Sequence, residues 1–121
     1  MRRITRLALV LALAACNGPR AGHDAADNAA LFTRQHAKHQ LRASVAGSDC
    51  HVLVIETTAE FDDDLVESIQ YGIGDYDAFG GADQFTHERG FRAVVYRDSA
   101  GHLWTYGATT RDEAQSIPRC R

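Results

Sequence analysis

The pattern of hydrophobic and polar positions predicts three strands. Residues 50–57 (CHVLVIET) are β-branched and almost continuously apolar, which is typical of a buried strand. Residues 91–97 (FRAVVYR) and 102–106 (HLWTY) predict two more strands. The turn sequence Asp98-Ser99-Ala100-Gly101 lies between them, so we expect these two strands to form a hairpin.

Three other segments carry helix signals. Residues 31–43 contain neither Gly nor Pro and predict a first helix. A capping box at residues 57–60 predicts a second helix that begins near Thr58 and ends at Gly72. A second capping box predicts a short closing helix over residues 110–117. The order α-β-α-β-β-α indicates an α+β domain, with a small, mainly antiparallel sheet of about three strands and helices packed on one face.

The N-terminus has the pattern of an export signal rather than of a folded element. Arginines at positions 2, 3 and 6 precede the entirely apolar residues 7–15, a run too short to cross a bilayer as a helix. Residues 17–30 have no large apolar side chain, so we expect a flexible tether there. The predicted organisation is a signal peptide at 1–15, a tether at 16–30 and one domain at 31–121.

The end of the apolar run, Leu13-Ala14-Ala15-Cys16, resembles the lipobox of bacterial lipoprotein precursors. The resemblance implies diacylation of the Cys16 thiol and cleavage before Cys16, which anchors the chain in the envelope facing the periplasm. Asn17 in the next place implies the outer rather than the inner membrane. Ordinary signal cleavage after residues 12–14, which also fit an A-x-A site, is the alternative.

If Cys16 carries lipid, two of the three cysteines remain to be assigned. Cys50 and Cys120 then remain in an oxidising compartment, where we expect them to form a disulfide. Closing a loop of about 70 residues contributes roughly 4 kcal/mol on a chain-entropy model. The alternative makes Cys50 a nucleophile, but a cysteine at the start of a strand lacks the helix dipole that stabilises a thiolate.

Charge narrows the classes of partner. The chain has 13 Lys and Arg against 16 Asp and Glu, so it has no basic excess for nucleic acid. Eight acidic residues and no basic one lie from Glu56 to Asp77. We expect a noncatalytic protein-binding domain of the immunity or inhibitor type, whose partner is a basic envelope or secreted protein. Its candidate binding residues are Asp62, Asp63, Asp64 and the aromatic Tyr106.

The glycine-rich segment 72–90 offers a calcium- or small-ligand-binding module as an alternative. Asp75 and Asp77 begin a sequence similar to an EF-hand loop, and Asp83 has its ninth place. Thr86 stands where the bidentate carboxylate belongs, so the match is incomplete.

A small cell-wall hydrolase is the third alternative, with His87 and His102 as its best candidates. The sequence has no Ser/His/Asp order typical of nucleophilic catalysis. We therefore name no catalytic residue and expect no cofactor.

Overall fold

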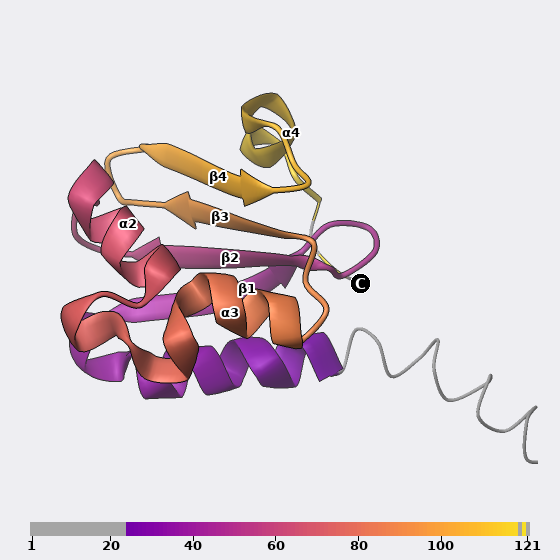
Figure 1. Ribbon diagram of the computed structural model, residues 1–121. Helices are drawn as coiled ribbons and strands as arrows, with labels where there is room; N and C mark the ends of the chain where they lie inside the picture. Colours follow the sequence, from indigo (N-terminus) through magenta and orange to yellow (C-terminus); the bar gives the residue numbers. More distant parts are fainter. Residues whose placement is uncertain (1–23, 119, 121) are drawn as a thin grey trace, which may run out of the picture.

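The computed structural model describes residues 24–118 and 120. They form one four-stranded sheet in the order β1-β2-β3-β4 (Figure 1). Strand β1 (Leu41–Ala46) pairs antiparallel with β2 (Val52–Thr57), and β3 (Ala93–Arg97) pairs antiparallel with β4 (Leu103–Gly107). The central pair β2–β3 is parallel. The predicted α+β class with a mainly antiparallel sheet is confirmed, with four strands rather than three.

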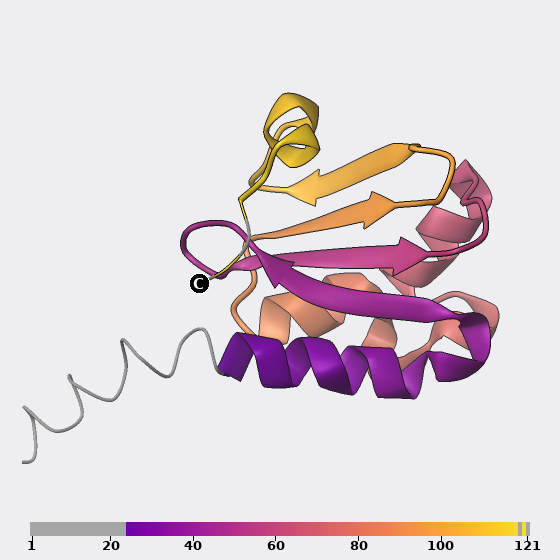
Figure 2. The same ribbon diagram turned by 180° about the vertical axis from the view of Figure 1, so that it is seen from behind.

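Helices cover the two faces of the sheet unequally. An N-terminal helix over residues 24–35, α2 (Asp63–Tyr71) and α3 (Gly81–Glu88) pack on one face. The short helix α4 (Arg111–Gln115) packs on the other face (Figure 2). Three short 3₁₀ turns complete the described elements: η1 (Ala37–His39), η2 (Gly74–Tyr76) and η3 (Ala78–Gly80).

The first strand corrects the prediction of one helix over residues 31–43. The helix is followed by η1, and Gln40 then has a φ of 58° that redirects the chain into β1. Leu41 and Ala43 are buried while Arg42 and Ser44 are exposed, which is the two-residue period of a strand. Pairing with β2 therefore overrides the helix propensity of these residues.

The N-terminal helix also corrects part of the predicted tether, because residues 24–30 are helical. Ala25 and Ala29 are 8% and 3% exposed, and Phe32 is fully buried against the sheet. Alanines at four-residue spacing give a helix face that packs closely without large side chains. The predicted signal peptide, Cys16 and the rest of the tether lie outside the described residues.

Helix α2 begins at Asp63, later than the prediction near Thr58. Thr57 still belongs to β2, and the main-chain N–H of the buried Phe61 donates to the carboxylate of Asp98 at 2.9 Å. Asp62 takes the N-cap place, and its carboxylate accepts from Leu65 N at 2.7 Å.

Three other predicted features are confirmed. Helix α2 ends at Gly72, whose φ of 69° suits a glycine. The β3–β4 hairpin forms around the turn at residues 98–101. The closing helix α4 has Thr110 as its N-cap, with its hydroxyl accepting from Glu113 N at 3.1 Å.

The larger core lies on the face that we call the helical face, toward which Leu53, Ile55, Val94 and Tyr96 point. Phe32, Ile69 and Phe85 from the three helices pack on these residues. This core also contains a buried polar pair, in which the Tyr96 hydroxyl donates to Gln70 Oε1 at 2.7 Å. The opposite face, to which Val52, Val54, Ala93 and Val95 belong, has a smaller core with Ala114 of α4.

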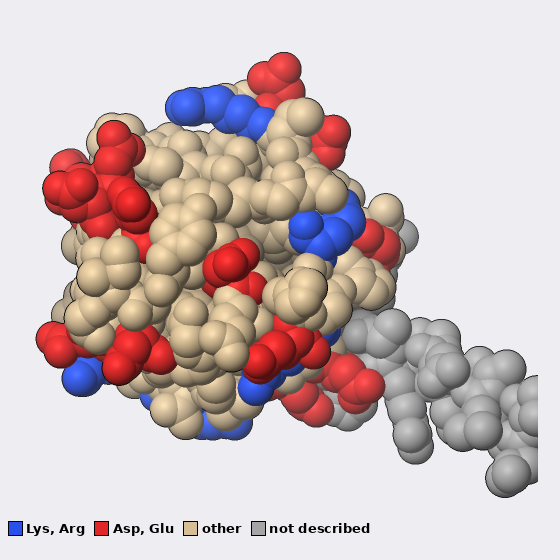
Figure 3. All heavy atoms as spheres, in the orientation of Figure 1, with Lys and Arg blue, Asp and Glu red and all other residues tan. Residues whose placement is uncertain are grey.

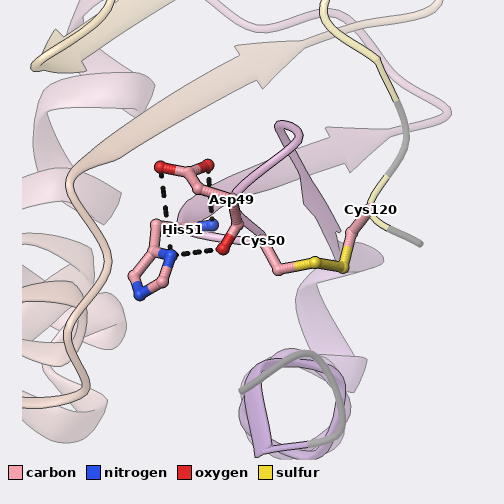
Figure 4. Close-up of a disulfide and its surroundings, with 4 residues drawn as sticks. All are labelled: Asp49, Cys50, His51 and Cys120. Atoms are coloured by element: carbon pink, nitrogen blue, oxygen red, sulfur yellow. Dashed lines mark hydrogen bonds and ion pairs between the residues drawn. A yellow bond between two sulfur atoms is a disulfide. The ribbon is translucent and has the colours of Figure 1, made fainter. Parts of the chain in front are cut away.

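The predicted disulfide between Cys50 and Cys120 is confirmed, with the two Cα atoms 4.9 Å apart (Figure 4). It joins the C-terminal segment to the β1–β2 connection, where Gly47 N also donates to Pro118 O at 2.8 Å. The adjacent Asp49 and His51 side chains interact with each other on the side away from the disulfide. The tail is therefore held covalently across one end of the sheet.

Among the described residues, no helix is long and apolar enough to span a bilayer.

Candidate functional site

A groove of about 290 Å³ opens on the helical face between α2, α3 and the edge strand β4. Figure 1 shows that β4 lies on the side of the sheet away from the N-terminal helix and α3. The groove is lined by Gln70, Tyr71, Asp83, Thr86, His87, Phe91, Arg92, Ala93, Val94, Tyr106 and Gly107. The incomplete helical cover over β4 thus leaves partly exposed side chains around a concave surface.

Two glycines bring the walls of this groove together. Gly72 ends α2 and Gly81 begins α3, and their backbones lie in contact. A Cβ built on Gly72 would lie 2.7 Å from the carbonyl carbon of Gly80, so a larger residue cannot fit without backbone movement. This close approach places Tyr71 and Asp83 beside the same groove.

Aromatic side chains form the wall on the β4 side. Tyr71 is 53% exposed, and its ring meets that of Tyr106 edge-to-face with centroids 6.2 Å apart. The Trp104 indole N–H donates to Asp63 Oδ1 at 2.8 Å, which ties β4 to the first turn of α2. Trp104 therefore fixes β4 to α2, whereas Tyr71 is exposed and Tyr106 partly exposed to solvent.

Acidic side chains surround these rings. Figure 3 shows carboxylates gathered over α2 and a further acidic group in the middle of the same face. Burial raises the pKa of the Tyr106 hydroxyl, and Tyr71, Glu67 and Asp63 act in the same direction. Tyr106 therefore stays a protonated hydrogen-bond donor at neutral pH. We call this region the α2–β4 surface: Asp63, Glu67, Tyr71, Asp83, Trp104 and Tyr106.

The arginine at the groove does not cancel its negative charge. Arg92 Nε donates to Asp49 Oδ2 at 2.7 Å, and a second guanidinium nitrogen donates to the carbonyl of Ala108. The hydrogen bond from Arg92 holds the pKa of Asp49 below its usual value. The guanidinium charge is thus matched by a carboxylate outside the α2–β4 surface.

The three predicted acidic residues, Asp62, Asp63 and Asp64, differ in what their side chains contact. Asp62 caps α2, and Asp63 accepts the indole hydrogen bond from Trp104. Asp64 is exposed, and its main-chain carbonyl accepts from the Ser68 hydroxyl at 2.9 Å. Only Asp63 of the three belongs to the α2–β4 surface, together with the predicted Tyr106.

The structure does not gather the predicted calcium ligands. Asp75 lies in η2, Asp77 lies between η2 and η3, and Asp83 lies in the first turn of α3 beside the groove. Within residues 24–118 and 120, no group of three or more His, Cys, Asp or Glu side chains is placed to hold a metal ion. The two 3₁₀ turns separate carboxylates that an EF-hand loop would bring together.

The two histidines considered for hydrolysis lie at opposite ends of the β3–β4 pair. His87 lines the groove beside Ala93 and Gly107. His102 is at the hairpin turn, where its Nδ1 lies 2.9 Å from the buried carboxylate of Asp98. They cannot act on one substrate atom together.

Sequence reasoning missed Glu67 and Tyr71. The signal was present, because Asp63, Glu67 and Tyr71 recur at four-residue steps along α2 and therefore share one face. The core residues Val66 and Ile69 belong to a different stripe of the same helix. What the sequence did not contain was the position of β4, which supplies Trp104 and Tyr106 beside that face.

Comparisons with protein-family models, curated proteins and solved structures gave no significant match for this chain.

Proposed function

We propose that this chain is a lipid-anchored bacterial envelope protein whose domain binds a basic protein through the α2–β4 surface. The anchor rests on the leader: three arginines, an apolar run and the lipobox-like Leu13-Ala14-Ala15-Cys16 occur in the order that export and lipidation need. Two acyl chains on Cys16 plus one on its amino group would give stable anchoring, which a single chain does not.

The observation that carries the binding function is the juxtaposition of exposed aromatic rings and unbalanced carboxylates. Tyr71 and Tyr106 supply rigid contact area of the kind enriched in binding hot spots. Glu67 and Asp83 have no side-chain ion pair with any described residue, so both are available to lysine or arginine of a partner. Complementary charge of this kind increases association rates and makes binding sensitive to salt.

An immunity or inhibitor protein acting on a basic envelope or secreted protein is the form of this function that the surface supports best. The groove is small, and it is lined by one carboxylate, that of Asp83, and by the rings of Tyr71 and Tyr106. A protein side chain, such as an arginine stacked on the exposed ring of Tyr71 beside Asp83, suits its size and charge.

The binding function is tested by capture from an envelope extract with the intact chain and two charge-matched variants. Glu67→Gln with Asp83→Asn neutralises the α2–β4 surface, whereas Asp75→Asn with Asp77→Asn removes the same charge elsewhere. We expect the wild type and the second variant to capture the same basic protein, and the first variant to bind it roughly tenfold more weakly. Affinity that is independent of salt, or equal in both variants, would refute the proposal.

The anchor has its own test, which does not depend on the partner. Intact mass spectrometry of the membrane fraction should give a chain beginning at Cys16 with added acyl mass, and Cys16→Ser should abolish both the acyl mass and the membrane association. A chain that begins at Ala15 without acyl groups would instead support ordinary signal cleavage.

A further inference from the structure

A second and larger groove, of about 680 Å³, lies on the opposite face of the sheet beside α4 and the C-terminal segment. Figure 2 shows this face with α4 at one side of the strands. The groove is lined by Arg42, Ser44, Val45, Ala46, Val54, Glu56, Arg97, Asp98, Ile117 and Cys120. Its size is within the range of small-molecule sites, and it shares no lining residue with the α2–β4 surface.

Three charged residues form one row across this groove. Arg42 of β1 is the register partner of Glu56 in β2, and Glu56 is the register partner of Arg97 in β3. Neighbouring side chains on one sheet face stand about 5 Å apart at Cβ, close enough for ion pairs. None of the three side chains nevertheless has a hydrogen bond or ion pair with any residue within 24–118 and 120.

Arg97 is the most informative member of the row. Its Nε is buried and has no hydrogen-bond partner among the described residues. The adjacent Asp98 cannot serve, because its fully buried carboxylate accepts from Phe61 N at 2.9 Å and His102 N at 2.8 Å. A guanidinium presents a planar fork of donors that fits a carboxylate, so this arginine lacks the acceptor it is shaped to bind.

We propose that this groove binds a free α-amino acid. The carboxylate would accept from Arg97, with Arg42 adding positive charge, and the α-ammonium would donate to Glu56. An α-amino acid carries both charges on one carbon atom, so a single small ligand placed between adjacent side chains of opposite charge can contact both, whereas a longer peptide separates the two charges. The partly buried Ile117 provides apolar surface for the side chain, and the Ser44 hydroxyl supplies a further polar contact.

The probes that test this assignment either remove one of the two charges or move them apart. L-leucine carries both groups, 4-methylpentanoate lacks the ammonium, L-leucinamide lacks the carboxylate, and the dipeptide Leu-Leu separates them. Titration calorimetry on the intact chain should detect L-leucine, with each of the other three roughly tenfold or more weaker. No binding of L-leucine, or equal binding of L-leucinamide, would overturn the proposal. Tighter binding of Leu-Leu would assign the groove to peptides instead.

Variants connect the binding to the named residues. Arg97→Gln should abolish binding of L-leucine, and Arg97→Lys should retain part of it because the charge remains without the fork. Glu56→Gln should weaken the binding of L-leucine but not that of 4-methylpentanoate, since only the amino acid has an ammonium group that uses Glu56. Arg111→Gln on α4 is the matched control, because Arg111 does not line the groove. Unchanged binding in Arg97→Gln, with the fold verified by circular dichroism, would refute the site.

Discussion

The two faces of the sheet are covered to different extents. On the helical face, three helices cover Leu53, Ile55, Val94 and Tyr96 with apolar side chains, and the polar pair Tyr96–Gln70 is closed on itself. On the opposite face, only the short α4 and the C-terminal segment provide cover, and the charged row Arg42–Glu56–Arg97 has no partners among the described residues. The first face is covered by three helices, whereas the second is covered by α4 and by a C-terminal segment whose Cys120 is bonded to Cys50 of the helical-face core, and it retains a groove of about 680 Å³.

The strongest way to break this contrast is to remove the disulfide. Replacing Cys50 and Cys120 with Ala should lower the free energy of unfolding by about 2–4 kcal/mol, because the unfolded chain regains the freedom of a long loop. Urea denaturation measures the loss. Hydrogen exchange should show lost protection in α4 and the tail, with α2 and α3 little changed. Equal loss over all elements would contradict the view that the disulfide mainly holds the C-terminal segment and α4 in place.

Removing the Tyr96 hydroxyl tests the buried hydrogen bond between Tyr96 and Gln70 on the helical face. Tyr96→Phe leaves the buried Gln70 Oε1 without its donor and should cost about 1–3 kcal/mol. Tyr106→Phe is the matched control, because the partly exposed Tyr106 hydroxyl has no hydrogen bond within the described part of the chain. We expect a change within about 0.5 kcal/mol for the control. Equal effects of the two substitutions would show that Gln70 finds another donor.

A smaller effect is the pH dependence of folding stability that arises from His36, a buried histidine of the helical face. His36 is 1% exposed, its Nδ1 lies 2.9 Å from Phe32 O, and its Nε2 is buried without a partner. Burial lowers the pKa of His36 below 6.5, and His39 acts in the same direction. The unfolded chain therefore binds more protons below pH 6.5, so stability is full above that pH and falls as the pH decreases from it.

The slope cannot exceed about 1.4 kcal/mol per pH unit for one proton. Urea midpoints measured between pH 7.5 and 5 should decrease for the wild type and stay flatter for His36→Gln. The exposed His87→Gln is the control and should follow the wild type. A wild-type midpoint that rises toward pH 5 would have the wrong sign for a buried neutral histidine.

Local sequence patterns predicted the elements with the strongest signals. The hairpin of β3 and β4 has an apolar run on each side of a turn, and α4 has a side-chain cap, so both were identified from neighbouring residues alone. The prediction of a helix over 31–43 was wrong because no local signal distinguishes β1 from a helix. Residues 41–46 become a strand because they pair with β2. The helix at residues 24–30 was not predicted because alanine buries little area. Its packing contribution becomes evident only beside the surface on which Ala25 and Ala29 lie.

The candidate sites show the same limit. Asp63 and Tyr106 were identified by residue type, and Glu67 and Tyr71 were accessible from helical spacing. Arg42, Glu56 and Arg97 carry no pattern in the sequence, because 55 positions separate the first from the last. Register across three strands brings them into one row.

The sequence by itself determined the lipobox-like leader, the α+β class, the hairpin, the caps of α4 and the pairing of two cysteines. Each of these depends on composition, on local periodicity or on counting residues. Only the tertiary structure decided that residues of the predicted first helix form strand β1, how the helices are distributed between the two faces, and where the two grooves lie. The physical reason is that grooves and charged rows arise from residues distant in sequence, and their relative positions are fixed by strand register and packing rather than by local preference.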